Sequence, residues 1–418
     1  MSLFTKHFFR IIPVIFHVLI LFSGCNSALN ITGMDISSIY SGQSENSLQI
    51  NQLYNITDSS STISIALPAG LIPPDPGTNK YTKKGHLKYV VIGEGKRTVL
   101  VDSASFEIAD TSDIQNFINH TWLFKAPVGM DYYVKATYSV PGIPEEYLLL
   151  EYFSKKNQLS HSWYRFQNQS GEYIPDNTMA YTQPIRVVTE DTTSRNFRVK
   201  IFSRNFPTPI PPFVEQLRAP FNYLPDSTFS LELKGGKSAF FTPARMGFYF
   251  FQSDTARVIG PTLFRMNAGF PKVTQHIMML DALRYITSSK EFQQLKAYEI
   301  PKVAVDSFWI ANTGRPDIAS ELIRKYYSRV ETANKLYTSF TDGWKTDRGM
   351  IYIVIGRPSS VYRSFDQEVW IYGEYDDPGA LRFFFNKAKN PFTDNDYVLE
   401  RNEYYKSSWY QCVQVWRR

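Results

Sequence analysis

The sequence predicts a multidomain, mainly β protein with one or two N-terminal β-sandwich domains, a helical connector and a C-terminal α+β domain. Short runs rich in β-branched and aromatic residues recur between about residues 62 and 259, separated by Gly, Pro, Asn or Asp turns. After Pro271, apolar residues instead recur at helical spacing, and strand-like runs return near the C-terminus. At about 150 residues per domain, a chain of 418 residues also fits two or three domains.

The first 24 residues are typical of a cleavable export signal. Lys6 and Arg10 form a basic start. The apolar run of residues 11–22 would span about 18 Å as a helix, well short of a bilayer core of roughly 30 Å. The next stretch, LFSGC at residues 21–25, resembles the lipobox of bacterial lipoproteins, whose cysteine becomes the lipidated N-terminus. We therefore predict lipid attachment at Cys25. An ordinary secretory signal followed by a chance cysteine is the alternative.

The residues after Cys25 bear on where the anchored protein lies. In bacteria with two membranes, surface-displayed lipoproteins tend to carry an acidic cluster directly after this cysteine, and none follows Cys25. Residues 25–61 are largely polar and are predicted to be a partly flexible tether. The expected localisation is the outer membrane, through the N-terminal lipid, on the periplasmic face.

Charge and cysteine content narrow the function classes. Loss of Lys6 and Arg10 leaves 43 basic residues of the original 45 against 39 acidic ones, a net charge of +4. That balance is mild and the basic residues are scattered, which argues against nucleic-acid binding. Cys412 is the only cysteine besides Cys25, so no intramolecular disulfide is expected once Cys25 is lipidated. Cys412 itself is predicted to be a small buried apolar side chain.

Residues 62–155 are predicted to form a first β-sandwich, and residues 156–270 either a second sandwich or a continuation of the first. Residues 197–201 alternate apolar and charged side chains, as a half-buried strand does. Regularly spaced short strands without helices between them are typical of a sandwich. The expected strands lie within residues 62–67, 86–93, 98–108, 131–140, 146–153, 161–166, 184–190, 196–202, 228–233 and 246–252.

Residues 271–418 are predicted to form a helical segment followed by an α+β domain. The helical pattern of residues 272–299 breaks at Ser288-Ser289, Pro301 opens a helix that ends at Gly314, and Pro316 opens the longest helix. The elements expected after it are a strand at 350–355, a turn at 356–358, strands at 368–372, 381–385 and 397–401, and a helix or strand at 404–416.

The most specific stretch is GWKTDRG, residues 343–349. Together with Tyr352, Gly356, Pro358 and the later Trp370-Ile371-Tyr372, it resembles the GWxTD domain of secreted or lipid-anchored bacterial proteins. The similarity extends over roughly residues 275–415, and GFYFFQSD (247–254) and LRYIT (283–287) are similar to long members of that family. The resemblance implies an α+β domain and an envelope location. It implies no established activity.

The first residues of this motif suit a junction between a helix and a strand. Gly343 is expected in a left-handed conformation just past the long helix. Trp344 is expected to fold back onto that helix, with its indole N–H bonded to one acceptor.

The remaining residues of the motif complete the predicted turn, which ends at Gly349. Thr346 and Asp347 are expected to bond nearby backbone N–H groups. Arg348 is expected to form an exposed ion pair with Asp342, Asp347 or Glu368. This interpretation makes the whole motif structural.

The alternative is a chemical site in which Asp342 and Asp347 share a proton or a metal beside Arg348. The sequence shows no further ligands at matched spacing, and no P-loop, Gly-x-Ser-x-Gly or Gly-x-Gly-x-x-Gly. Residues 93–96 and 394–396 are interpreted as turns. The histidines outside the signal are scattered: His86, His120, His161 and His276. We therefore predict no catalytic residues, no metal and no cofactor.

Aromatic residues make up 16% of the chain, an unusual excess. The strands around residues 131–133 and 247–251 carry more rings than one sandwich face buries. Such rings either form exposed surfaces for protein or glycan or are buried where two domains pack. These features together predict a non-enzymatic, lipid-anchored envelope protein that contacts another envelope protein through aromatic sandwich and GWxTD surfaces. A periplasmic hydrolase or glycan-binding protein using the acids around Asp347 is the alternative.

Overall fold

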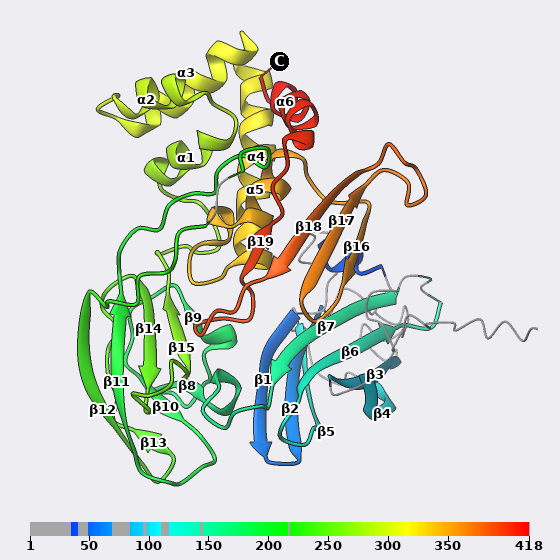
Figure 1. Cartoon of the computed structure of the whole chain (residues 1–418), viewed down its shortest axis with the longest axis vertical. Helices are drawn as coiled ribbons and strands as arrows, with labels where there is room; N and C mark the ends of the chain where they lie inside the picture. Colours follow the sequence, from blue (N-terminus) through cyan, green and yellow to red (C-terminus); the bar gives the residue numbers. More distant parts are fainter. Residues whose placement is uncertain are drawn as a thin grey trace, which may run out of the picture.

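A computed structural model describes residues 35–40, 49–68, 84–94, 98–109, 117–142, 144, 146–215 and 218–417. Two units of strands are followed by a unit of helices and strands, which lies across both of them (Figure 1). The predicted fold class, mainly β with a C-terminal α+β region, is confirmed. The predicted signal and Cys25 lie outside the described residues.

The N-terminal unit consists of two antiparallel sheets around one core. Strand β2 directs Ile63, Ile65 and Leu67 into a core that also contains Val91 and Val134 of the other sheet, as the two-residue period of a strand requires. This packing is sandwich-like. One sheet has the order β1 (Gln49–Thr57), β2 (Ser60–Pro68), β5 (Phe117–Lys125), and the other has the order β4 (Thr98–Ala109), β3 (Lys84–Glu94), β6 (Asp131–Ser139), β7 (Glu146–Ser154).

The N-terminal segment differs from the sequence prediction. Residues 25–61 were expected to be a tether, but the described part of this segment belongs to the fold. Residues 35–40, including the short helix η2 (Ser37–Tyr40), pack against the C-terminal unit, and β1 pairs along β2. The polar composition of residues 25–61 suggested a flexible tether, but polar side chains of this segment are hydrogen-bonded within the fold. Buried Asn55 donates to the Ser162 hydroxyl at 2.8 Å and accepts from the Ser61 hydroxyl at 2.7 Å.

The second unit is a single sheet of eight strands that shares no strand with the first unit. All its pairings are antiparallel except that of β15 with β9. Phe166 on β8 and Leu263 on β15 belong to one core although these strands lie near opposite ends of the sheet, so the sheet curves round that core. Its order is β8 (Arg165–Asn168), β10 (Ile185–Val188), β13 (Lys237–Ser238), β12 (Ser227–Lys234), β11 (Arg195–Phe202), β14 (Gly247–Gln252), β15 (Thr262–Arg265), β9 (Thr178–Met179).

The aromatic strands are buried on both faces because the units pack together. On β14, Tyr249 and Phe251 face the core of the eight-stranded sheet. Phe248 and Phe250 face the C-terminal unit, where their rings lie 4.7 and 5.0 Å from the ring of Phe392. On β6, Tyr132 lies in the sandwich core, and Tyr133 lies against Phe365 with the ring centres 4.7 Å apart. The rings that suggested exposed binding surfaces therefore lie either in the core of their own unit or in contacts between units.

The C-terminal unit combines helices with an antiparallel sheet of order β16-β17-β18-β19. The helices predicted to start at Pro301 and Pro316 are confirmed, and the break at Ser288-Ser289 is where Ser288 caps a helix. No helix in the described ranges is long and apolar enough to cross a membrane. The elements are α1 (His276–Ala282), η6 (Leu283–Tyr285), α2 (Ser289–Lys296), α3 (Pro301–Thr313), α4 (Pro316–Tyr337), η7 (Gly343–Lys345), α5 (Asp347–Val354), β16 (Ser360–Arg363), β17 (Gln367–Tyr372), β18 (Leu381–Lys387), β19 (Tyr397–Leu399), η8 (Glu403–Tyr405) and α6 (Lys406–Val415).

The strand expected at residues 350–355 is wrong, because most of this stretch lies in helix α5. Every residue of α5 after Asp347 is buried, so the apolar run has no one-sided period that would identify it as a helix. The helix is set by its start, where the Thr346 hydroxyl accepts from the N–H of Gly349. The motif therefore joins two helices, and the first strand of the sheet is β16 further on.

Candidate functional site

The two glycines of the motif allow three helical segments to approach backbone to backbone. A Cβ on Gly343 would lie 1.9 Å from the carbonyl oxygen of Ala333 in α4. A Cβ on Gly349 would lie 1.9 Å from the carbonyl oxygen of Gly343. Gly343 does not have a positive φ, so the predicted left-handed conformation is wrong. The absence of a side chain, not backbone freedom, makes glycine necessary at both positions.

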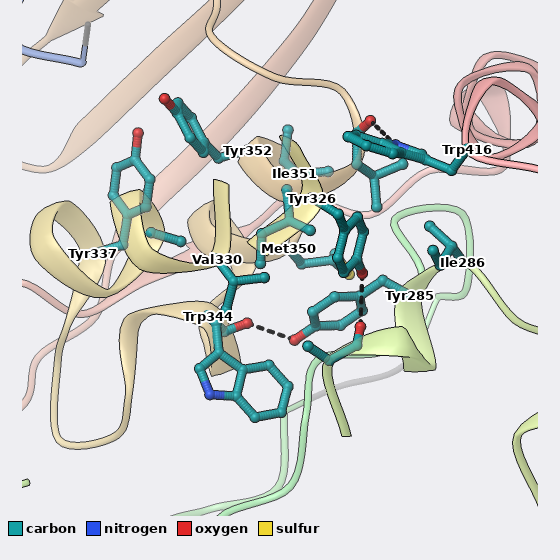
Figure 2. Close-up of a cluster of buried hydrophobic side chains, with 14 of the residues drawn as sticks. Tyr285, Ile286, Tyr326, Val330, Tyr337, Trp344, Met350, Ile351, Tyr352 and Trp416 are labelled. Carbon is teal, nitrogen blue, oxygen red and sulfur yellow. Dashed lines mark hydrogen bonds between the residues drawn. The ribbon is translucent and has the colours of Figure 1, made fainter. Parts of the chain in front are cut away.

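Trp344 attaches the motif to η6, through Tyr285, and to α4, through Asn334 (Figure 2). Its side chain is 2% exposed and meets Tyr285 edge to face, with the ring centres 6.1 Å apart. The Tyr285 hydroxyl donates to the carbonyl oxygen of Trp344 at 2.7 Å, and the N–H of Trp344 donates to the Asn334 side chain at 3.2 Å. The expected acceptor for the indole N–H is not found among the described residues. Trp344 thus acts through ring packing and its backbone.

Thr346 closes the turn at both ends. Its hydroxyl donates to the carbonyl oxygen of Gly343 at 2.7 Å and accepts from the N–H of Gly349 at 3.1 Å. Because the N-terminal N–H groups of a helix lack partners within the helix, this cap fixes where α5 begins.

Asp347 connects the start of α5 to the last strand of the sheet. Its carboxylate pairs with both terminal nitrogens of Arg401 at 2.5 and 3.2 Å and accepts from the N–H of Leu399 at 2.9 Å. Arg401 also donates to the carbonyl oxygen of Ile210 in the second unit at 3.3 Å. A carboxylate held by a bidentate arginine contact and a backbone N–H is fixed in place, and the arginine compensates its negative charge.

Arg348 lies in the interior, contrary to the exposed ion pair that the sequence suggested. Its side chain is 1% exposed and pairs at 3.3 Å with Glu368, which is fully buried. Its other terminal nitrogen donates to the Asn395 carbonyl at 3.1 Å and to the Asn395 side chain. The guanidinium also lies 4.1 Å from the ring centre of Tyr397 and 5.2 Å from that of Tyr337.

Glu368 is the centre of a buried polar cluster. One carboxylate oxygen accepts from the Tyr40 hydroxyl at 2.8 Å and from the Trp370 indole N–H at 2.6 Å. The other accepts from Arg363 at 2.7 Å and from Arg348 at 3.3 Å. Burial alone would raise the pKa of Glu368, but the charges of Arg363 and Arg348 outweigh it and lower the pKa. The ionised carboxylate joins α5, β16, β17 and the N-terminal segment.

The two carboxylates proposed for a shared site have separate partners. Asp342 pairs with Lys345 at 3.1 Å, and Asp347 pairs with Arg401. Within the described ranges, no group of three or more His, Cys, Asp or Glu side chains is arranged to hold a metal ion. The charges of the motif therefore hold segments of the chain together.

Comparison with known families places this architecture. Residues 247–418 match the GWxTD domain. The chain therefore contains a GWxTD domain. The match begins at Gly247, the first residue of β14, so the GWxTD domain includes two strands of the eight-stranded sheet as well as the C-terminal unit. Comparison with curated proteins gives no match.

A second polar cluster lies where the GWxTD domain meets both β units, and sequence reasoning missed it. The His161 ring nitrogen Nε2 lies 2.9 Å from the Asp394 carboxylate. The Lys387 ammonium lies 3.8 Å from the same carboxylate and 3.0 Å from the ring centre of Tyr152 on β7. His161 belongs to η4 (His161–Trp163), just before the second sheet. These residues come from distant parts of the chain, so no local spacing could indicate the cluster.

Several groups at this junction have shifted pKa values. Burial, reinforced by the charge of Asp176, raises the pKa of Glu151 to about 8. Burial lowers the pKa of Lys387 to about 8. Burial would also lower the pKa of His161, but the charge and hydrogen bond of Asp394 outweigh it and raise the pKa. The charge of the junction therefore changes close to neutral pH.

The stretch of residues 394–396, interpreted from sequence as a simple turn, supplies partners to four cationic side chains, Lys387 among them. Asp394 pairs with His161, Asn395 accepts from Arg348, and Asp396 pairs with Arg218 at 3.0 Å. Two acids and an amide in one short turn were the available signal. Their partners could not be read from the sequence.

Among the clefts on the described part of the surface are two open ones, and Asp347 lines neither of these. One, of about 390 Å³, lies between the two β units beside Asp58, Trp163 and Arg195. The other, of about 400 Å³, lies on the GWxTD domain between β18 and η8. Its wall includes Arg401, which holds Asp347.

Proposed function

We propose that this protein is a lipid-anchored component of the bacterial cell envelope that acts as a non-enzymatic binding scaffold for another envelope protein. The observation that carries the proposal is how the motif uses its charges. Asp342, Asp347 and Arg348 each pair with a residue of the same domain, and Arg348 does so in the interior. A general acid or base must reach a proton on a substrate, and these groups are already committed to internal partners.

The N-terminal sequence supports the location. Residues 1–24 resemble an export signal, and Cys25 stands where a lipobox cysteine would be acylated. More than one acyl chain gives lasting attachment. The absence of an acidic cluster after Cys25 favours the periplasmic face of the outer membrane.

The surface we assign to the partner is the outer face of α3. Ile300, Val303 and Ile310 are exposed and fall at helical spacing on one side of this helix, and Val303 is 44% exposed. Tyr298 is exposed beside them. A group of exposed apolar side chains on one face suits a protein partner better than a sugar.

Crosslinking and affinity purification from intact membranes test the function. We expect a stoichiometric envelope protein with the wild-type chain and with Val415→Asp, which changes an exposed valine on α6. We expect its loss with Val303→Asp. Recovery of the protein without a partner, but with a small molecule that it converts, would overturn the proposal.

Membrane attachment is tested by fractionation with a matched cysteine control. Cys25→Ala should move the protein out of the carbonate-washed membrane fraction, whereas Cys412→Ala should leave it there. A Cys25→Ala protein that stays in the washed membranes would contradict lipid anchoring.

A second candidate, glycan binding, is favoured by the cleft on the GWxTD domain. Phe384, Tyr404 and Tyr405 offer rings there, and Arg382 and Glu400 offer polar groups. Rings with a few polar groups are suited to a sugar. Binding of soluble cell-wall glycan fragments should be lost with Tyr404→Ala and kept with Tyr410→Ala, an exposed tyrosine on α6. Equal binding by both variants would rule out this cleft.

A further inference from the structure

Residues 35–40 lie in the GWxTD domain as a bound peptide would. Ile36 is fully buried, Tyr40 is 2% exposed, and both belong to the core of the C-terminal unit. The contact is remote in sequence, since Tyr40 and Glu368 are 328 positions apart. Ser38, between the two buried side chains, is exposed.

The start of the segment pairs with the edge of the sheet. The N–H of Ile36 donates to the carbonyl oxygen of Val361 in β16 at 2.8 Å. The N–H of Val361 in turn donates to the Asp35 carboxylate at 2.8 Å, so the aspartate replaces the carbonyl that a neighbouring strand would supply. β16 is an edge strand of its sheet, and extended peptides commonly bind such edges.

The end of the segment fills a pocket suited to tyrosine. The ring of Tyr40 lies between Tyr337 and Trp370, with ring centres 5.4 and 5.6 Å away. Its hydroxyl donates to Glu368 at 2.8 Å and accepts from Arg363. A hydroxyl both donates and accepts, so phenylalanine would leave a buried carboxylate and a guanidinium each short of one partner.

We propose that this pocket is a peptide-binding site of the GWxTD domain, which takes short peptides with aspartate, an aliphatic residue and tyrosine at the spacing of Asp35, Ile36 and Tyr40, and that the chain's own segment is its resident, exchangeable ligand. Three side chains and one backbone hydrogen bond make the main contacts, and each can be made equally by a separate peptide. The assignment does not depend on lipid at Cys25.

The test uses the whole chain after the signal, with a specific protease sequence inserted between Tyr40 and Gln49. Cutting it turns residues 35–40 into part of a separate peptide that starts in its site. A fluorescent peptide of residues 33–42 is then added, and its anisotropy is followed against protein concentration. Competitor peptides carry Tyr40→Phe, Tyr40→Ala or, as the matched control at the exposed position, Ser38→Ala.

The cut protein should stay folded, and the labelled peptide should bind saturably as it replaces the cut segment. The Ser38→Ala peptide should compete as well as the parent peptide. Both Tyr40 peptides should compete at least about tenfold less well, because a site built to bond a hydroxyl rejects a ligand without one.

Equal competition by all the peptides would show that the tyrosine pocket does not select its ligand. Unfolding on cutting, or a cut segment that neither leaves nor exchanges over a day, would show that residues 35–40 are a fixed part of the fold. Either outcome would overturn the proposal.

Discussion

Glu368→Gln should strongly destabilise the GWxTD domain. The carboxylate has four donors, two on each oxygen: Tyr40 and Trp370 on one, Arg363 and Arg348 on the other. Glutamine keeps one acceptor oxygen, so two donors would face its NH₂ group. The change also removes the negative charge between two guanidinium groups, where Arg348 is 1% exposed. Removing one partner of a buried ion pair costs about 3–5 kcal/mol.

Thermal unfolding measures this loss. A domain the size of residues 247–418 shifts its melting temperature by about 2–4 °C per kcal/mol, so a fall of roughly 6–20 °C is expected. The transition can be followed by tryptophan fluorescence, because Trp309, Trp344 and Trp370 are buried in this domain. Glu374→Gln makes the same chemical change at an exposed position and serves as the control. A Glu368→Gln protein that melts within about 2 °C of this control would refute the reasoning.

Three further predictions follow from the same geometry. Trp344→Ala should cost about 3–5 kcal/mol and make the C-terminal unit sensitive to protease, and unchanged stability would contradict its buried role. Asp347→Asn should cost about 1.5–3 kcal/mol while partner binding persists, whereas a rate loss of about 100-fold in any assay would indicate an acid or base. The pKa of Glu151 rises from 4.5 to about 8, so the folded state holds an extra proton between these values. Stability should therefore fall as pH rises through this window, by at most about 1.4 kcal/mol per pH unit. Urea unfolding at pH 5 and pH 8 should show a smaller fall for Glu151→Gln, and an equal fall would contradict the shift.

Local signals in the sequence were sufficient to predict many of the helices and strands. Pro301 and Pro316 start helices α3 and α4, and Gly314 ends the first of them, as expected. In the structure Gly314 has a left-handed conformation. These signals depend on interactions within a few residues, so they can be interpreted from the sequence without knowledge of the rest of the fold. The alternation of residues 197–201 likewise predicted β11, since one face of this strand is buried and the other is exposed or partly exposed.

Burial set by distant segments could not be predicted. Helix α5 is enclosed on all sides, which removes the one-sided pattern that distinguishes a helix from a strand. Strand β1 is polar because Asn55 bonds side chains from elsewhere in the fold. Glu368 was one of three partners considered for Arg348, but only the packing around both residues decides the pair and makes it an interior one. The residues of the motif could be identified, whereas their partners could not.

In the lipid-anchored protein that we propose, the docking of residues 35–40 would change how a force on the anchor reaches the fold. If residues 25–61 were a free tether, its fully extended length of roughly 120 Å, at about 3.3–3.6 Å per residue, would set the largest distance between the lipid and the folded part. Because Asp35 and Ile36 are bound to β16, only ten residues separate the lipid from the fold, about 35 Å when fully extended. The GWxTD domain, last in the sequence, would then stand next to the bilayer. A force on the anchor would act on the contacts of Tyr40 with the Glu368 cluster before it acted on the strands of the sandwich.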